Sequence, residues 1–349
     1  MENLMKEQIH GGDVYRHPDV LDFSANMNPL GTPESVILAA QKGVRNICNY
    51  PDVQQHKLKT ALADYENVPY GSLICGNGAA ELIFTLAQAL RPKRAVVLAP
   101  TFAEYELALK SVGCEMHHVM LFEEDGFELK SVQGVCDEVS AGADLVCLCN
   151  PNNPTGKLIS RKMILSILNH CRKHHSRLLL DECFNDFIDD PDTYTLKHDF
   201  YEYPNLFLLK AFTKRYAMAG LRLGYGICSD VGLLDRMGRC VQPWNISIPA
   251  QEAGTAALME KDYEKRARLL IRTEREWLKG ELRNEGLTVY DSKANYIFFK
   301  GPEDLGRHCL ENKVMIRDCS NYAGLAKGYY RIAVKRHEEN EQLIRAIGR

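Results

Sequence analysis

A cation-rich segment, Lys210-Ala-Phe-Thr213-Lys214-Arg215, follows directly on the apolar run Leu206–Leu209. A lysine on a buried segment has a lowered pKa when burial and neighbouring cations disfavour its charged form, and its neutral amine is then a nucleophile for aldehydes. Arg222, eight residues after Lys214, is a fixed cation for an anionic group. The segment indicates chemistry on a carbonyl compound beside an anion, although a lone lysine is more often a solvated surface residue.

An acidic pair, Asp181-Glu182, ends the apolar run Leu178–Leu180. A carboxylate in that place is costly to remove from water unless it meets a cation or a metal ion. The pair therefore predicts one carboxylate that faces a positively charged ligand. The alternative is that Asp181 or Glu182 only caps the segment that follows.

Two loops at the ends of predicted strands carry further polar groups. In Cys75-Gly-Asn-Gly78-Ala-Ala-Glu81 the glycines permit a tight turn into a helix, where the free N–H groups of Ala79 and Ala80 could hold a phosphate. Glu81 stands where a dinucleotide fingerprint needs a third glycine, so that interpretation fails, while a plain structural turn stays open. The loop Asn150-Pro-Asn-Asn153-Pro-Thr-Gly156 holds three asparagines and two prolines, which favours a rigid loop that aims an amide at a ligand.

The elements that must position these groups follow from the apolar pattern. Short apolar runs alternate with helical patterns from about residue 50 to residue 237, which predicts an α/β fold with a mainly parallel central sheet. Helices cover both faces of such a sheet, and ligands bind where its strands end. The predicted strands are Ala95–Ala99, Glu115–Met120, Leu145–Cys149, Arg177–Leu180, Leu206–Leu209 and Arg222–Cys228. The predicted helices are Ala79–Leu90, Ala103–Val112, Arg161–Lys173 and Val231–Gly238.

The pattern changes after Asn245, which predicts a second, smaller α+β domain. An N-terminal helix is expected from Thr32-Pro33-Glu34, with Thr32 as its cap. We expect a large domain over 45–245, with the arm 1–44 joining a small domain over 246–349. The small domain is predicted to contain one long helical stretch, Ala250–Asn284, strands at Leu287–Tyr290, Asn295–Phe299, Met315–Arg317 and Tyr329–Val334, and a helix at Glu338–Ile347.

The composition excludes several classes of protein. The 349 residues carry 43 Lys and Arg against 46 Asp and Glu, a formal charge of −3, which argues against nucleic acid or a membrane surface as a partner. No apolar run approaches the ~20 residues that span a bilayer. The first ten residues lack the apolar stretch of a signal peptide, which predicts a cytoplasmic protein. The 12 cysteines have no metal-ligand or CxxC spacing, so we expect reduced, buried thiols and no metal.

A phosphate cradle, an asparagine loop, a buried carboxylate and a lysine with an arginine together match pyridoxal 5′-phosphate (PLP). At this point the sequence resembles the class I/II aminotransferase family of fold-type I, PLP-dependent enzymes over essentially its whole length. The motifs that carry the resemblance are Asn153-Pro-Thr-Gly156, Asp181-Glu182 and Thr213-Lys214 with Arg222, in the order of the family. The fold expected from it is a large α/β domain with a smaller α+β domain.

The resemblance implies a role for each residue of the site. Lys214 would bond to the aldehyde of PLP, Asp181 would pair with the protonated ring nitrogen, and Arg331 would bind the carboxylate of the substrate. The other cofactor ligands would be Asn153 at the ring hydroxyl, Phe102 stacked on the ring, and Ala79, Ala80, Thr213, Arg222 and Tyr50 at the phosphate. Tyr50 would come from a second subunit, so the resemblance also implies a homodimer with shared active sites.

Two positions depart from the family pattern, namely Ala211, where a serine is frequent, and Phe184, where a tyrosine is frequent. Phe184 agrees with members that decarboxylate rather than transaminate. Those members, and their nearest aminotransferase relatives, act on a small phosphorylated amino compound, which requires a second cationic site. The residues proposed for this substrate are Arg317, 14 residues before Arg331, together with His10, Asn28 and Gly31 on the N-terminal arm. His10 could equally be a simple turn residue beside two glycines.

Overall fold

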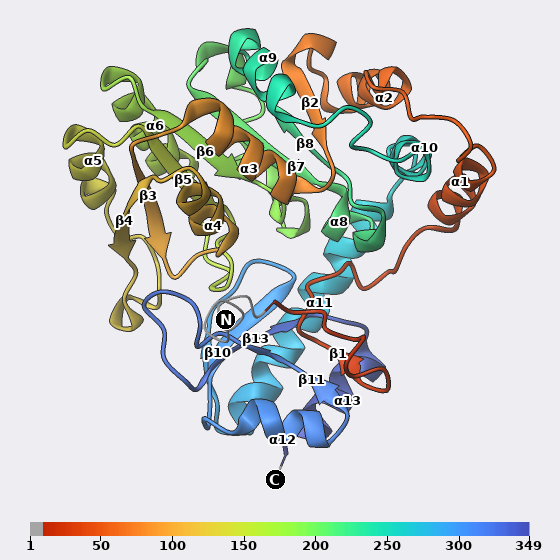
Figure 1. Cartoon of the computed structure of the whole chain (residues 1–349). Helices are drawn as coiled ribbons and strands as arrows, with labels where there is room; N and C mark the ends of the chain where they lie inside the picture. Colours follow the sequence, from red (N-terminus) through yellow and green to blue (C-terminus); the bar gives the residue numbers. More distant parts are fainter. Residues whose placement is uncertain (1–9, 349) are drawn as a thin grey trace, which may run out of the picture.

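A computed structural model describes residues 10–348 of the chain; the first nine residues of the predicted arm lie outside this range. Figure 1 shows two unequal parts, an upper one built around a large sheet and a lower one built around a smaller sheet, with α11 (Tyr263–Asn284) running between them. The prediction of an α/β fold with a second, smaller α+β part is confirmed. The exact division at residues 45 and 245 stays a prediction.

The large sheet has seven strands. Neighbouring strands are parallel, except that β8 is antiparallel to both of its neighbours, β2 and β7. The five strands from β7 to β4 are therefore parallel to one another, as predicted. In order across the sheet the strands are β2 (Leu73–Gly76), β8 (Gly224–Ile227), β7 (Leu206–Ala211), β6 (Arg177–Asp181), β5 (Leu145–Cys149), β3 (Arg94–Ala99) and β4 (Glu115–Met120). Strand β2 was not predicted, because its four residues run straight into the glycine-rich turn.

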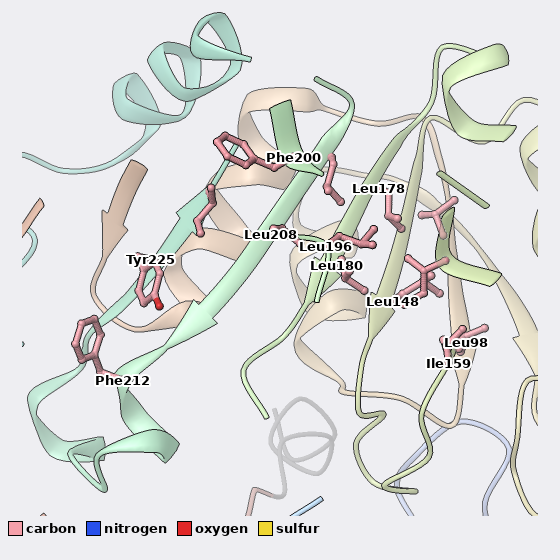
Figure 2. Close-up of a cluster of buried hydrophobic side chains, with 14 of the residues drawn as sticks. Leu98, Leu148, Ile159, Leu178, Leu180, Leu196, Phe200, Leu208, Phe212 and Tyr225 are labelled. Atoms are coloured by element: carbon pink, nitrogen blue, oxygen red, sulfur yellow. The ribbon is translucent and has the colours of Figure 1, made fainter. Parts of the chain in front are cut away.

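Alternate residues of the sheet enter two separate cores, one on each face, because successive side chains of a strand point to opposite sides. The first, which we call the α6-side core, is covered by α1 (Glu34–Val44), α2 (His56–Glu66), α5 (Gln133–Ser140), α6 (Arg161–Lys173) and α10 (Ile248–Ala257). Figure 2 shows ten of its side chains with labels, among them Leu148, Leu178 and Leu208 from three neighbouring strands. The α3-side core on the other face is covered by α3 (Ala79–Leu90), α4 (Glu104–Ser111), α9 (Val231–Cys240) and α11.

The small sheet is antiparallel, with the order β12 (Arg317–Asp318), β13 (Tyr329–Ala333), β10 (Tyr296–Lys300), β9 (Thr288–Tyr290). A third core lies beneath it, against α12 (Leu305–Glu311), α13 (His337–Ile347) and the second half of α11. The N-terminal strand β1 (Leu21–Asp22) pairs in parallel with β11 (Val314–Met315), so the start of the described chain joins the small part. The strand predicted at Met315–Arg317 is thus two short strands that pair with different neighbours.

Two further predictions were wrong. Thr32 does not cap α1, because its hydroxyl donates instead to the carbonyl of Ala217 at 2.7 Å and Pro33 occupies the cap position. The single helix predicted over 250–284 is two helices, α10 and α11, because Asp262 between them has a left-handed backbone with φ of 58°. The remaining short α-helices are α7 (Pro191–Tyr194) and α8 (Phe212–Arg215).

All 12 cysteines are free thiols, and ten of them are buried, as predicted. In the part of the chain that the structure describes, every helix is too short or too polar to cross a membrane. The cytoplasmic location stays a prediction.

Candidate functional site

A cavity of about 680 Å³ lies where the strands β3, β5, β6 and β7 end, and the small sheet contributes its other wall. The predicted residues that line it come from nine different elements or loops. They are His10, Ala79, Ala80, Phe102, Asn153, Asp181, Thr213, Lys214, Arg222, Arg317 and Arg331. Three predicted residues, Asn28, Gly31 and Tyr50, do not line it.

The anion-binding end of the cavity is built on the start of α3. The first residues of this helix, Ala79 and Ala80, face the cavity, and their backbone N–H groups lie at the positive end of the helix dipole. Arg222 lies against Gly78, since a Cβ on that glycine would come within 2.5 Å of the Arg222 guanidinium. Gly224 similarly lets β8 approach the backbone N of Ala79, to which a Cβ would come within 2.5 Å. Backbone donors and a guanidinium thus converge on one small anionic group.

The two lysines of the cation-rich segment have opposite environments. Lys210 is buried among acids, with Nζ 3.6 Å from Glu182 and 3.8 Å from Asp186. Burial alone would lower the pKa of Lys210, yet Asp186 and the other acids raise it above its ordinary value. Burial lowers the pKa of Lys214, and Arg331 and Arg222 lower it further, to about 8. These environments favour Lys214 over Lys210 as the nucleophile, because the pKa of Lys214 is lowered and that of Lys210 is raised.

The acidic pair is divided in the same way. Glu182 points away from the cavity, accepting hydrogen bonds from the Thr195 hydroxyl at 2.6 Å and the Leu196 N–H at 2.9 Å. Asp181 lines the cavity and accepts from the Cys183 N–H at 2.9 Å and the Tyr105 hydroxyl at 2.6 Å. Both donors are neutral, so burial still raises the pKa of Asp181. A cation in the cavity is what would stabilise this carboxylate.

The small sheet supplies two buried arginines. Arg317 on β12 and Arg331 on β13 stand opposite one another in the antiparallel register, and their exposed fractions are 5% and 6%. Arg331 donates to the Asn153 side-chain oxygen and, at 2.7 Å, to the Ser24 carbonyl, both neutral oxygens. Like charges in facing positions destabilise a sheet. This part of the cavity is therefore suited to a ligand with anionic groups.

The three predicted residues outside the cavity have other contacts. Asn28 is buried and donates its amide to the Arg215 carbonyl at 2.8 Å, and Gly31 accepts from the Tyr263 hydroxyl at 2.6 Å. In this chain both hold the N-terminal segment to the large part, so the geometry does not support them as substrate ligands. Tyr50 is 78% exposed and stacks on Trp244 with ring centroids 4.6 Å apart.

Two polar residues of the site were missed, Tyr105 and Glu104. Tyr105 is the hydrogen-bond donor to Asp181, and Glu104 lines the cavity beside His10. Their position in the first turn of the helix after β3 was a usable signal, because that helix begins at the edge where ligands bind. The two departures from the family pattern, Ala211 and Phe184, also line the cavity, where Phe184 packs edge-on against Tyr296.

The residues present fit PLP. The buried Asp181, which has only neutral donors, suits the protonated ring nitrogen, and the glycine-lined start of α3 suits a phosphate, because a Cβ at Gly78 would fill this space. Lys214 and Thr213 lie between these two places, on α8. Among residues 10–348, the structure brings together no three His, Cys, Asp or Glu side chains that could hold a metal ion.

Comparison with known proteins agrees with this geometry. Residues 18–347 match the family model of aminotransferase class I and II, so the chain belongs to this family and its cofactor is pyridoxal 5′-phosphate. A threonine-phosphate decarboxylase of Salmonella typhimurium is 37% identical over 97% of this chain and 95% of its own length. A histidinol-phosphate aminotransferase structure from Clostridium acetobutylicum has a TM-score of 0.87 at 29% identity, covering 94% of this chain and 98% of its own. An L-threonine-O-3-phosphate decarboxylase structure from Porphyromonas gingivalis has a TM-score of 0.82 at 26% identity, covering 93% and 97%.

Gly224→Ala tests the close approach of β8 to α3. We expect a loss of about 1–3 kcal/mol in the free energy of unfolding and weaker PLP binding, because the new Cβ must displace Ala79. Gly238→Ala is the matched control, since a Cβ there meets nothing within 4 Å and α9 should gain stability. Denaturant unfolding and PLP titration of both variants would measure this. Equal stability and PLP affinity in the two variants would contradict the tight packing.

The pKa of Lys214 predicts how the cofactor-free enzyme captures PLP. The capture rate should rise with pH through a midpoint near 8, because only the neutral amine attacks the aldehyde. Arg331→Gln should move the midpoint upward, since it removes a cation that lowers the pKa of Lys214. The visible absorbance band of bound PLP measures the rate. Arg307→Gln, on an exposed side chain of α12, should leave the midpoint in place, and Lys214→Ala should abolish the band. A downward shift in Arg331→Gln would contradict the assignment.

Proposed function

We propose that the protein decarboxylates L-threonine O-3-phosphate to (R)-1-aminopropan-2-yl phosphate, a step of cobalamin biosynthesis. The observation that carries the proposal is the facing pair Arg317 and Arg331 beside Lys214 in one cavity. This substrate has two anionic groups, a carboxylate and a phosphate ester, and therefore needs two cationic sites besides the one for the cofactor phosphate. The likeness to the Salmonella decarboxylase supports the same choice.

Arg331 is the proposed carboxylate ligand. Its hydrogen bond to Asn153, the residue expected at the ring hydroxyl, keeps the guanidinium next to the cofactor. A guanidinium binds a carboxylate through two parallel hydrogen bonds, which fixes the orientation of the bond between Cα and the carboxylate carbon. Arg317, its cross-strand partner, lies near Glu104 in the same cavity and is left for the phosphate.

When bound, PLP supplies an aldehyde for the substrate amine and an electron-withdrawing ring that accepts the electron pair of the broken bond. The chain's own residues decide which bond this is. Arg331 would fix the direction of the bond between the carboxylate and Cα, and Asp181 would hold a proton at the ring nitrogen. The protonated Lys214 ammonium would then deliver a proton to Cα, for which its lowered pKa of about 8 suits it.

Transamination of histidinol phosphate with 2-oxoglutarate is the second candidate. It is favoured by the TM-score of 0.87 to the Clostridium aminotransferase, and it would use the same residues. The departure at Phe184 argues for the decarboxylase, because a phenyl ring lines the cavity where family members frequently have a tyrosine hydroxyl. Without that tyrosine hydroxyl, the ring hydroxyl of PLP lacks one supporting contact, which makes the site less suited to transamination.

We also propose a homodimer in which Tyr50 reaches the cofactor phosphate of the partner subunit. Several large apolar side chains close to Tyr50 in the sequence are exposed, and a second subunit would cover them. They are Ile37, Leu38, Val44, Ile47 and Val53, and the exposed Trp244 stacks on the Tyr50 ring. Tyr50 does not line the cavity of its own chain and is exposed, as the crossing requires.

The proposed reaction is tested by incubating the PLP-loaded enzyme with L-threonine O-3-phosphate and measuring CO₂ and aminopropanol phosphate. We expect both products in equal amounts without any added keto acid, because the carboxylate carbon leaves and nothing accepts an amino group. The second incubation contains histidinol phosphate with 2-oxoglutarate. Turnover there, together with no CO₂ in the first incubation, would replace the decarboxylase by the aminotransferase.

Arg317→Ala tests the phosphate site. The KM for L-threonine O-3-phosphate should rise about 10- to 100-fold, as expected when a charge-assisted hydrogen bond is lost, while the much weaker use of L-threonine should change little. Arg307→Ala, an exposed arginine of the same small part, is the control and should leave both values unchanged. Equal losses on the phosphorylated and the unphosphorylated substrate would refute the role of Arg317 as a phosphate ligand.

A further inference from the structure

One carboxylate in the cavity has no role in the reaction described so far. Glu104, in the first turn of α4, is mostly buried, and its Oε1 lies 3.3 Å from Nδ1 of His10. Its other oxygen, Oε2, is buried without a hydrogen-bond partner among the described residues. A negative group in a cavity that binds two anions is costly unless it acts on something else there. The contact indicates that Glu104 acts on His10.

The segment that carries His10 is held in a fixed place. Gly11 lies so close to the Ser24 carbonyl that a Cβ would come within 2.3 Å of the oxygen, and the Gly12 N–H donates to the Ser24 hydroxyl at 2.7 Å. The Ser24 carbonyl is also the acceptor for Arg331. The position of His10 is thus tied through Ser24 to the arginine of the substrate carboxylate.

We propose that Glu104 is a positioning residue for the substrate phosphate, because its carboxylate holds His10 at the cavity as an imidazolium beside Arg317. With Nδ1 directed at Glu104, the ring's Nε2 N–H is the donor left for a phosphate oxygen. The inference rests on the proposed function, since it assumes a phosphorylated substrate. The ligand chemistry it requires is a phosphate monoester bound by one guanidinium and one imidazolium.

The charges that face Glu104 come from several elements. His10 approaches from the N-terminal segment, Arg317 from β12 and Lys214 from α8, and Tyr322 lies in the same wall. Burial raises the pKa of Glu104 above its ordinary value, and His10, Arg317 and Lys214 oppose this effect. A carboxyl group so placed keeps its negative charge only while cations stay near it. His10 is the cation on the N-terminal segment that lies closest to this carboxylate, at 3.3 Å.

The test compares the pH dependence of phosphate binding in Glu104→Gln and in the unchanged enzyme. An imidazole without a carboxylate neighbour is charged at about pH 6 and neutral at about pH 8. The ratio of the KM of Glu104→Gln to that of the unchanged enzyme for L-threonine O-3-phosphate should therefore be near one at about pH 6 and on the order of tenfold at about pH 8. The ionisation of the substrate phosphate is common to both enzymes and cancels in this ratio.

Three controls separate positioning from general damage. Glu115→Gln removes an acid that pairs with a histidine, His117, at 2.9 Å outside the cavity, and its ratio should stay near one at both pH values. The KM for L-threonine and kcat should change by less than about twofold in Glu104→Gln, because neither the carboxylate site nor the proton transfer is altered. His10→Gln should reproduce the loss at about pH 8, where the double variant should add nothing to it.

A second measurement does not depend on turnover. Histidine-selective carbon NMR, with the His10 signal assigned by its absence in His10→Gln, should show His10 charged to a higher pH in the unchanged enzyme than in Glu104→Gln. Identical titration curves, or a KM ratio that is the same at both pH values, would overturn the proposal. If the enzyme proves to transaminate histidinol phosphate, the proposed decarboxylation fails, but the same ratio measured with that ester still decides the role of Glu104.

Discussion

The site depends on cations that the fold holds close together away from water. Arg317 and Arg331 face one another across two strands, and Arg331 and Arg222 both act on the Lys214 amine. Each of these contacts is repulsive and weakens the folded chain when no anion is bound. The same repulsion makes Lys214 a usable nucleophile near neutral pH. The closeness of these cations therefore explains both the reactivity of Lys214 and the affinity for anions. Packing in the rest of the structure offsets their repulsion.

The packing around the cavity supplies that support. The two cores on the faces of the large sheet fix the strand ends that carry Asp181 and Lys214. The helix α11 belongs both to the α3-side core and to the small core, so it joins the wall with the two arginines to the wall with the lysine. Buried acids beside Lys210 and Arg215 neutralise those cations, which leaves Lys214 alone with a lowered pKa in its segment. The strand or loop that carries each group sets its place, and the charged residues around it set its protonation state.

The sequence predicted most of the sheet, because buried parallel strands are continuous apolar runs that end in polar residues. It could not decide between Asp181 and Glu182, or between Lys210 and Lys214, from the residues alone, because each choice depends on partners distant in the chain such as Tyr105 and Asp186. Glu104 was missed for the same reason, since its significance comes from its contact with His10. Asn28 was proposed for the substrate because it lies on the N-terminal arm, and its amide hydrogen bond to the backbone of Arg215 could not be read from the sequence.

The N-terminal segment shows how a neutral chain can bind anions selectively. Its strand β1 pairs with β11, and Ser24 just after it accepts a hydrogen bond from Arg331. The segment also brings His10 to Glu104, so one stretch of chain contacts Arg331 and places a histidine at the same cavity. The net charge of −3 is spread over the surface and says nothing of this arrangement. In the proposed function, the fixed separation between two cationic places would select a molecule with two anionic groups at that spacing.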